Sequence, residues 1–211
     1  MSGYAVPSRA AGGEDSKDMK SRPILMFAPM VQAILAGNKT QTRREIKVPA
    51  VEGATAKGCK YGTVGDQLWV RETFRHFGNK SEGGKNFALV TYRQDGISLE
   101  IEVENPPVEK WWNTGYAPWK PPIFMPRAAS RITLEITGIR VERLQDISEG
   151  DAQAEGVVLG EDRSFSHAEH GLHYTPYRTA YSALWERING PGSWAKNPLC
   201  WVISFKKIIK L

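Results

Sequence analysis

Apolar residues along the chain occur in short runs and alternations that are separated by Gly, Pro, Asp and Asn. Short alternating or continuous apolar runs indicate β-strands, whereas apolar residues spaced three and four apart indicate helices. On this basis, strands are expected within residues 22–27, 38–46, 67–72, 87–92, 97–103, 131–136, 139–143 and 199–205. Helices are expected at residues 29–36, 149–155 and 177–188.

The connections between these elements indicate the fold class. Asp95-Gly96 is a hairpin signal, and Thr137-Gly138 is interpreted as the turn between two strands. Ser148 followed by Asp151 resembles the capping box that opens a helix. Strands joined by hairpins, without regular βαβ units, favour an α+β fold with a mixed or antiparallel sheet, which can close into a small β-barrel with helices packed outside.

Length and composition narrow the classes of protein. The 211 residues fit a single domain, expected over residues 21–211, whereas residues 1–20 lack apolar periodicity and are expected to be a disordered leader. No apolar run approaches the ~20 residues that cross a bilayer, so no membrane partner is expected. The formal charge of +5 suits a polyanion or a phosphate-bearing partner without requiring one. Cys59 and Cys200 lie outside any metal-binding spacing, so reduced thiols and a cytoplasmic location are expected.

Common catalytic motifs are absent, since the sequence contains no P-loop, dinucleotide fingerprint, H-E-x-x-H helix or G-x-S-x-G elbow. The remaining candidates for chemistry are Lys39, Thr42 and Glu155. A turn can bring the amine of Lys39 near the hydroxyl of Thr42, and burial or the cations Arg43 and Arg44 can lower the pKa of the amine until it acts as a base. Glu155 ends a predicted helix, where the helix dipole calls for a cationic partner. The alternative, that these are ordinary surface and strand residues, remains open at this point.

Several segments together carry a resemblance to a known family. They are Leu35–Arg43, Gly65–Glu72, Asp151–Gly156 and Trp201–Lys206, with further similarity at Met125–Arg127, Ser130-Arg131 and Val141–Ile147. In this order they resemble the ASCH family of the PUA-like superfamily, especially its longer prophage-type members, over nearly the whole chain from Arg22 to Lys206. The G-x-K-T-x-T-x-R core of the small members is present, with Arg43 at a position that is usually aliphatic.

The resemblance implies a PUA-like fold and an amidohydrolase activity. Small bacterial members hydrolyse N4-acetylcytidine with a Lys, Thr and Glu set that matches Lys39, Thr42 and Glu155. Thr42 would then attack the acyl carbonyl, Lys39 would take its proton, and Glu155 would hold the cytosine or protonate its leaving amine. No cofactor or metal is expected, and the partner is expected to be a modified nucleoside or RNA. The chain is longer than the small hydrolases, so insertions at about residues 74–126 and 158–177 are expected to reshape the cleft.

Further substrate-binding candidates lie in the family-like segments, namely Arg43, Arg44, Arg71, Glu72, Arg127 and Arg131. Arginines there can hold phosphate or stack on a base, and structural ion pairs are the alternative. Aromatic residues that interleave with lysines suit base stacking or loop packing, namely Trp111, Trp112, Tyr116 and Trp119. The closely spaced His167, His170 and His173 lack the further ligands that zinc requires.

Two other functions remain open. Some ASCH members are described as RNA-binding or ribonuclease-like, so the resemblance also allows an RNA-binding module or a ribonuclease. A prophage accessory protein that acts through contact with another protein is the third hypothesis.

Overall fold

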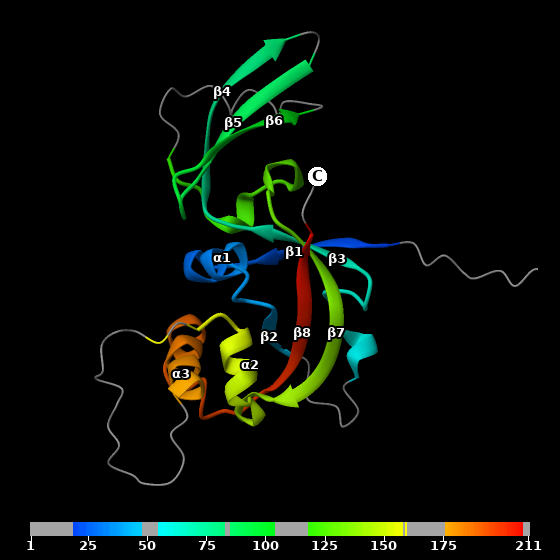
Figure 1. Ribbon diagram of the computed structural model, residues 1–211, viewed down its shortest axis with the longest axis vertical. Coiled ribbons are helices and arrows are strands. Elements are labelled where there is room, and N and C mark those ends of the chain that lie inside the picture. Colours follow the sequence, from blue (N-terminus) through cyan, green and yellow to red (C-terminus); the bar gives the residue numbers. More distant parts are fainter. Residues whose placement is uncertain are drawn as a thin grey trace, which may run out of the picture.

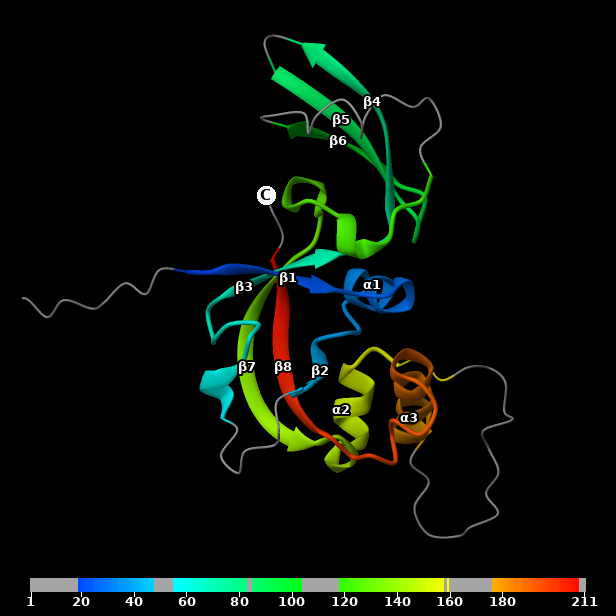
Figure 2. The ribbon, with the colours of Figure 1, turned by 180° about the vertical axis from the view of Figure 1, so that it is seen from behind.

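The computed structural model describes residues 19–47, 55–82, 85–103, 118–157, 159 and 176–208. The expected leader at residues 1–20 therefore lies almost entirely outside the described residues, and so do Trp111, Trp112, Tyr116 and the three histidines of the second insertion. The described part forms two β-sheets and three helices, arranged as in Figures 1 and 2. The predicted α+β class is confirmed at this level.

The larger sheet has five strands in the spatial order β1-β3-β7-β8-β2. Their bounds are β1 Ser21–Leu25, β2 Gln41–Glu45, β3 Gln67–Arg71, β7 Thr133–Arg143 and β8 Leu199–Ile208. Strands β1 and β3 run parallel, and the other neighbours are antiparallel. The predicted turn at Thr137-Gly138 is wrong, because β7 continues through it with a register shift between Ile136 and Gly138. A one-residue bulge bends a strand without ending its pairing. The sequence at such a bulge can resemble that of a turn.

The smaller sheet is built from the first expected insertion. It contains β4 (Phe74–Glu82), β5 (Lys85–Tyr92) and β6 (Ser98–Val103) in an antiparallel meander. Strands β5 and β6 were expected, whereas β4 was not, because its sequence FRHFGNKSE has no period-two alternation. In Figures 1 and 2 this sheet extends away from the two C-terminal helices.

Three α-helices accompany the larger sheet: α1 (Ala28–Leu35), α2 (Glu149–Ala154) and α3 (Pro176–Asn189). Short 3₁₀ turns lie at Ala56–Gly58, Pro122–Phe124, Arg127–Ala129 and Leu144–Asp146. The predicted cap of α2 is confirmed, since Ser148 Oγ accepts a hydrogen bond from the backbone N–H of Asp151 at 3.1 Å. Helices α2 and α3 pack together beside β2, as Figures 1 and 2 show.

The main core lies within the larger sheet and under α1. Its buried members include Ile24, Val31, Leu68, Leu134 and Ile203, from four strands and the first helix. A second cluster joins α2 and α3 to β8 through residues such as Ala152, Tyr181, Trp185 and Cys200. This cluster packs α2 and α3 against the side of the sheet that carries β2. It therefore fixes the positions of the two helices relative to β2.

The edge strands of the larger sheet, β1 and β2, are linked through a side chain. The guanidinium Nη2 of Arg44, in β2, donates to the carbonyl oxygen of Leu25, at the end of β1, at 2.6 Å. It also lies 3.5 Å from Met26 Sδ. Arg44 therefore links the C-terminal end of β1 to β2.

Cys59 and Cys200 are free thiols and both are buried. Among the described residues, no helix is long and apolar enough to cross a membrane.

Candidate functional site

Two tight turns bring Lys39 against Glu155, although 116 residues separate them in sequence. After α1, Gly37 adopts a φ of +81°, which glycine tolerates without a Cβ penalty, and the chain turns into β2. Glu155 is the C-cap of α2, and Gly156 follows with a φ of +80°. An isolated antiparallel bridge pairs Lys39 with Glu155, and the N–H of Thr40 donates to the carbonyl of Ala154 at 2.9 Å.

The Lys39 ammonium is buried and fully hydrogen-bonded. Its Nζ donates to Glu155 Oε2 at 2.7 Å, to the Glu155 carbonyl oxygen at 2.8 Å and to the Gln41 carbonyl oxygen at 2.8 Å. The side chains of Lys39 and Glu155 are 0% and 2% exposed. The cationic partner that the helix dipole demanded of Glu155 is therefore present.

Burial controls the acid–base behaviour of Lys39. Loss of hydration lowers the pKa of its amine, against the attraction of Glu155, which raises it, and the nearby Arg44 and Arg43 lower it further. The two arginines were expected to lower the pKa of the Lys39 amine, and they do so. An amine whose pKa is lowered gives up a proton more readily than a surface lysine does.

Arg43 is buried with its charge paired. Its Nη1 donates to Gln41 Oε1 at 2.7 Å and lies 3.4 Å from Glu155 Oε1. Its Nη2 contacts Glu142 Oε2 at 2.9 Å and Asp151 Oδ2 at 3.2 Å. Because these carboxylates surround it, the guanidinium can be buried without an uncompensated charge. It also fixes the second oxygen of Glu155.

Thr42 and Glu155 line the same pocket, between β2, α3 and the start of α1. Thr42 is 2% exposed, and its hydroxyl forms no hydrogen bond within the described residues. The amine of Lys39 contacts the carbonyl of Gln41, which belongs to the peptide group that precedes Thr42. The structure therefore brings Lys39 to Glu155 and places Glu155 and Thr42 in one pocket, but the Lys39 amine is directed at Glu155 rather than at the hydroxyl, and Lys39 is not part of the pocket lining.

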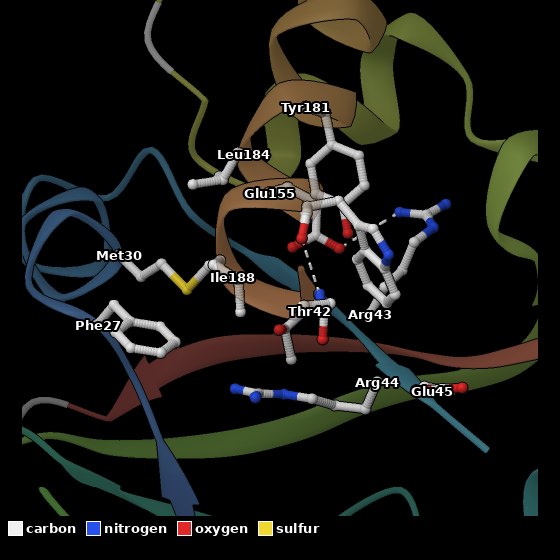
Figure 3. Close-up of a pocket in the computed structure, with 12 residues that line it drawn as sticks. Phe27, Met30, Thr42, Arg43, Arg44, Glu45, Glu155, Tyr181, Leu184 and Ile188 are labelled. Atoms are coloured by element: carbon white, nitrogen blue, oxygen red, sulfur yellow. Dashed lines mark hydrogen bonds and ion pairs between the residues drawn. The ribbon is translucent and has the colours of Figure 1, made fainter. Parts of the chain in front are cut away.

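The pocket has a polar end and an apolar end. In Figure 3, Glu155, Arg43 and Tyr181 lie on one side of Thr42. The other side carries apolar side chains, namely Phe27, Met30, Leu184 and Ile188. The pocket holds about 60 Å³ of space for solvent, where one water needs about 10–15 Å³. A ligand of several heavy atoms can therefore enter.

Most of the apolar and aromatic lining was not predicted as part of a site. The helix expected at residues 177–188 carries four of these residues on one face, namely Tyr181, Leu184, Trp185 and Ile188. Their sequence signal, an apolar stripe at helical spacing, is the same for a helix that packs on a core and for one that lines a pocket. Phe27 was expected within the strand at residues 22–27, but it is the N-cap of α1, is 55% exposed and lines the pocket.

The predicted substrate-binding residues separate into two groups. Arg43 and Arg44 line the pocket, but Arg71, Glu72, Arg127 and Arg131 do not. Arg131 instead forms a two-point ion pair with Glu72, with both N–O distances 2.9 Å, and contacts Asp95 Oδ2 at 2.7 Å. For Arg131 and Glu72, the alternative of a structural ion pair is therefore the one that the structure has.

Arg71 and Arg127 lie over Trp69. Their guanidinium carbons are 4.6 Å and 5.8 Å from the indole centroid, within the range of cation–π attraction. In the described part of the chain, neither forms an ion pair with a carboxylate. A similar contact places Arg75 at 4.5 Å over Trp119. The first insertion contributes no described residue to the pocket lining.

No residues of the described structure form a cluster of His, Cys, Asp and Glu that could hold a metal ion. Comparison of the chain with protein-family models found no matching family, and comparisons with curated proteins and with solved structures found no match either.

Proposed function

We propose that the protein is an amidohydrolase that removes the N4-acyl group from acylated cytosine nucleosides. The observation that carries the proposal is the buried Lys39–Glu155 pair, of which Glu155 lines the same pocket as Thr42, whose hydroxyl forms no hydrogen bond among the described residues. Lysine, threonine and glutamate in this arrangement supply a base, a nucleophile and an acid without a metal.

The first step activates Lys39. In the resting arrangement the amine is a protonated ammonium whose three protons are donated to oxygens, so it has no lone pair that could accept the proton of Thr42. Burial disfavours both charges of the pair, and a substrate that fills the pocket removes more water. Transfer of one proton from the ammonium to Glu155 gives a neutral amine and a neutral carboxylic acid.

The second step transfers the acyl group to Thr42. The Thr42 oxygen attacks the acyl carbon while its proton passes to the Lys39 amine, and the bond from the acyl carbon to N4 breaks as the Glu155 acid protonates the leaving nitrogen. Free cytidine departs, the threonyl ester remains, and the lysinium–glutamate pair is restored. Attack of water on the ester, with Lys39 and Glu155 again handling the protons, releases the carboxylic acid and frees Thr42.

The polar end of the pocket suits the pyrimidine. Arg43 is held in place by three carboxylates and an amide, so its guanidinium N–H groups have fixed positions at this end of the pocket. Tyr181 and Trp185, 3% and 5% exposed, provide aromatic walls for a planar ring.

Incubation of the purified protein with N4-acetylcytidine and a chelator, followed by chromatographic detection of cytidine, tests the proposal. Thr42→Val preserves the β-branched shape and removes the nucleophile, so we expect turnover to fall by at least about 10³-fold, to the background set by binding alone. Thr40→Val is the matched control, since Thr40 is exposed two residues earlier, and it should retain full activity. Absence of cytidine release from N4-acetyl and longer N4-acyl substrates, free and in RNA, would refute the proposal.

The proposal includes a PUA-like fold. The mixed sheet with helices beside it and the Arg44 link between its edge strands support a barrel-like closure. The two free cysteines accord with a reducing cytoplasm.

RNA binding is a second candidate function, favoured by the arginines that lie over Trp69. Arg71 and Arg127 can contact phosphates. The neighbouring Ile123 is exposed and offers apolar surface, and its carbonyl oxygen accepts a hydrogen bond from Arg71 at 3.3 Å. Single-stranded RNA should then bind with an affinity that falls steeply with salt, and Arg71→Gln with Arg127→Gln should reduce the salt slope. An affinity that does not respond to salt would exclude this function.

A further inference from the structure

One side of the pocket is lined by apolar side chains from two helices. Phe27 and Met30 come from the entry and first turn of α1, and Leu184 and Ile188 come from successive turns of α3. In Figure 3 the four side chains gather on the side of Thr42 that faces away from Arg43 and Tyr181. These residues from two separate helices form an apolar wall beside the nucleophile, and Arg44, whose guanidinium donates to the Leu25 carbonyl oxygen, lines the pocket next to it.

The position of Thr42 between the two ends determines which part of a substrate meets this wall. The carbon attacked by Thr42 carries the amide nitrogen and cytosine on one side and the acyl chain on the other. If the polar cytosine lies toward Glu155, the acyl chain must extend in the opposite direction. That direction contains Met30 and Ile188. A polar base and an apolar chain therefore match the two ends of the pocket.

We propose that these four residues form an acyl-binding subsite that selects acylated cytosine nucleosides with aliphatic acyl groups longer than acetyl. This inference rests on the proposed amidohydrolase function and specifies its substrate class. Each methylene that moves from water to the wall should improve recognition about 4-fold, until the wall is filled. An acetyl methyl contacts only the part of the wall nearest Thr42 and uses little of it.

A chain-length series gives the kinetic test. The value of kcat/KM is measured for the N4-acetyl, N4-propionyl and N4-butyryl derivatives of cytidine under one set of conditions. We expect a rise of about 4-fold for each added methylene, or about 16-fold from acetyl to butyryl. Equal values across the series, or the highest value for acetyl, would overturn the inference while leaving the proposed function intact.

A binding series decides the inference independently of turnover. The N4-methyl, N4-propyl and N4-pentyl derivatives of cytidine lack an acyl carbonyl and cannot be hydrolysed. Their affinities, followed by quenching of tryptophan fluorescence with Trp185 in the pocket lining, should increase with chain length. If no acyl substrate is hydrolysed, the proposed function fails, yet this series still reports whether the wall binds an alkyl chain. Affinities that do not change with length would overturn the subsite.

Two variants of α3 form a matched pair. Leu184→Gln replaces an apolar lining residue with a polar one of similar size that suits a helix, and it should reduce the 16-fold preference for butyryl to about 4-fold or less. Ala183→Gln changes the exposed neighbour on the same helix, outside the pocket, and should retain the full preference. Thermal unfolding of both variants reports whether they are folded. If Leu184→Gln and Ala183→Gln give the same chain-length dependence, the subsite is wrong.

Discussion

Replacing Lys39 with methionine tests whether the pair with Glu155 organises the fold as well as the site. The substitution keeps the length of the side chain and removes its charge. Glu155 Oε2 then loses the Lys39 ammonium at 2.7 Å, while Oε1 keeps the contact of 3.4 Å with Arg43. Leaving one member of a buried pair without its partner costs about 3–5 kcal/mol. Because Arg43 remains, we expect a loss near the lower end, about 3 kcal/mol.

The double variant Lys39→Met with Glu155→Gln separates pairing from packing. Glutamine has the shape of glutamate without the charge, so the double variant contains no unpaired carboxylate at this position. Its loss of stability should therefore be smaller than the sum of the two single losses by at least about 1 kcal/mol. Urea unfolding at neutral pH, followed by tryptophan fluorescence, measures all four proteins.

An exposed ion pair provides the control. Lys206 Nζ lies 3.1 Å from Glu135 Oε1, but the two side chains are 62% and 34% exposed. Lys206→Met should therefore cost at most about 1 kcal/mol. If Lys39→Met costs no more than Lys206→Met, or if the two single losses at the buried pair are additive within about 0.5 kcal/mol, the buried pair does not have the role assigned to it.

Three further predictions concern the backbone and pH. Gly156→Ala places a Cβ 2.7 Å from that of Ala33 and 2.8 Å from that of Lys39 at a φ of +80°, so it should cost at least about 2 kcal/mol in urea unfolding. Gly190→Ala, at a φ of +97° with no atom within 4 Å, should cost only the backbone part, about 1–2 kcal/mol, and equal losses would contradict the steric argument. Burial, with a smaller effect of Lys120, lowers the pKa of His76 from 6.5 to about 4. The unfolded chain therefore binds the extra proton first, so the free energy of unfolding should fall as the pH falls from about 6.5 to about 4, and His76→Gln should flatten this slope. Ser148→Ala removes the cap of α2 and should cost about 1 kcal/mol, whereas Ser148→Asp, which can still accept from the N–H of Asp151, should cost less.

The strands and helices with local signals were predictable from the sequence. The helix at 149–155 carried Ser148 at its start and Gly156 at its end, and the structure places α2 there. The strand at 74–82 carried no such signal, because its residues do not alternate between apolar and polar. It forms through hydrogen-bonded pairing with β5, which the local sequence does not reveal. The bulge at Thr137 shows the converse, since a glycine-containing dipeptide resembled a turn although long-range pairing with β8 continues across it.

The candidate site was only partly predictable. The helix dipole at Glu155 predicted that a cation would lie nearby, but sequence separation alone could not identify Lys39 as that cation. Burial of Arg43 could not be derived either, because it depends on Glu142 and Asp151, which only the folded chain brings to it. The Arg131–Glu72 ion pair likewise depends on the junction of the two sheets.

The position of β2 at the edge of the larger sheet has a consequence for solubility. An edge strand exposes backbone donors and acceptors that can pair with another chain. Here the bridge of Lys39 with Glu155 and the hydrogen bond from Thr40 to Ala154 cover the start of that edge with the end of α2. Substitutions that release α2 would therefore uncover a template for intermolecular strand pairing, so aggregation would accompany loss of the site.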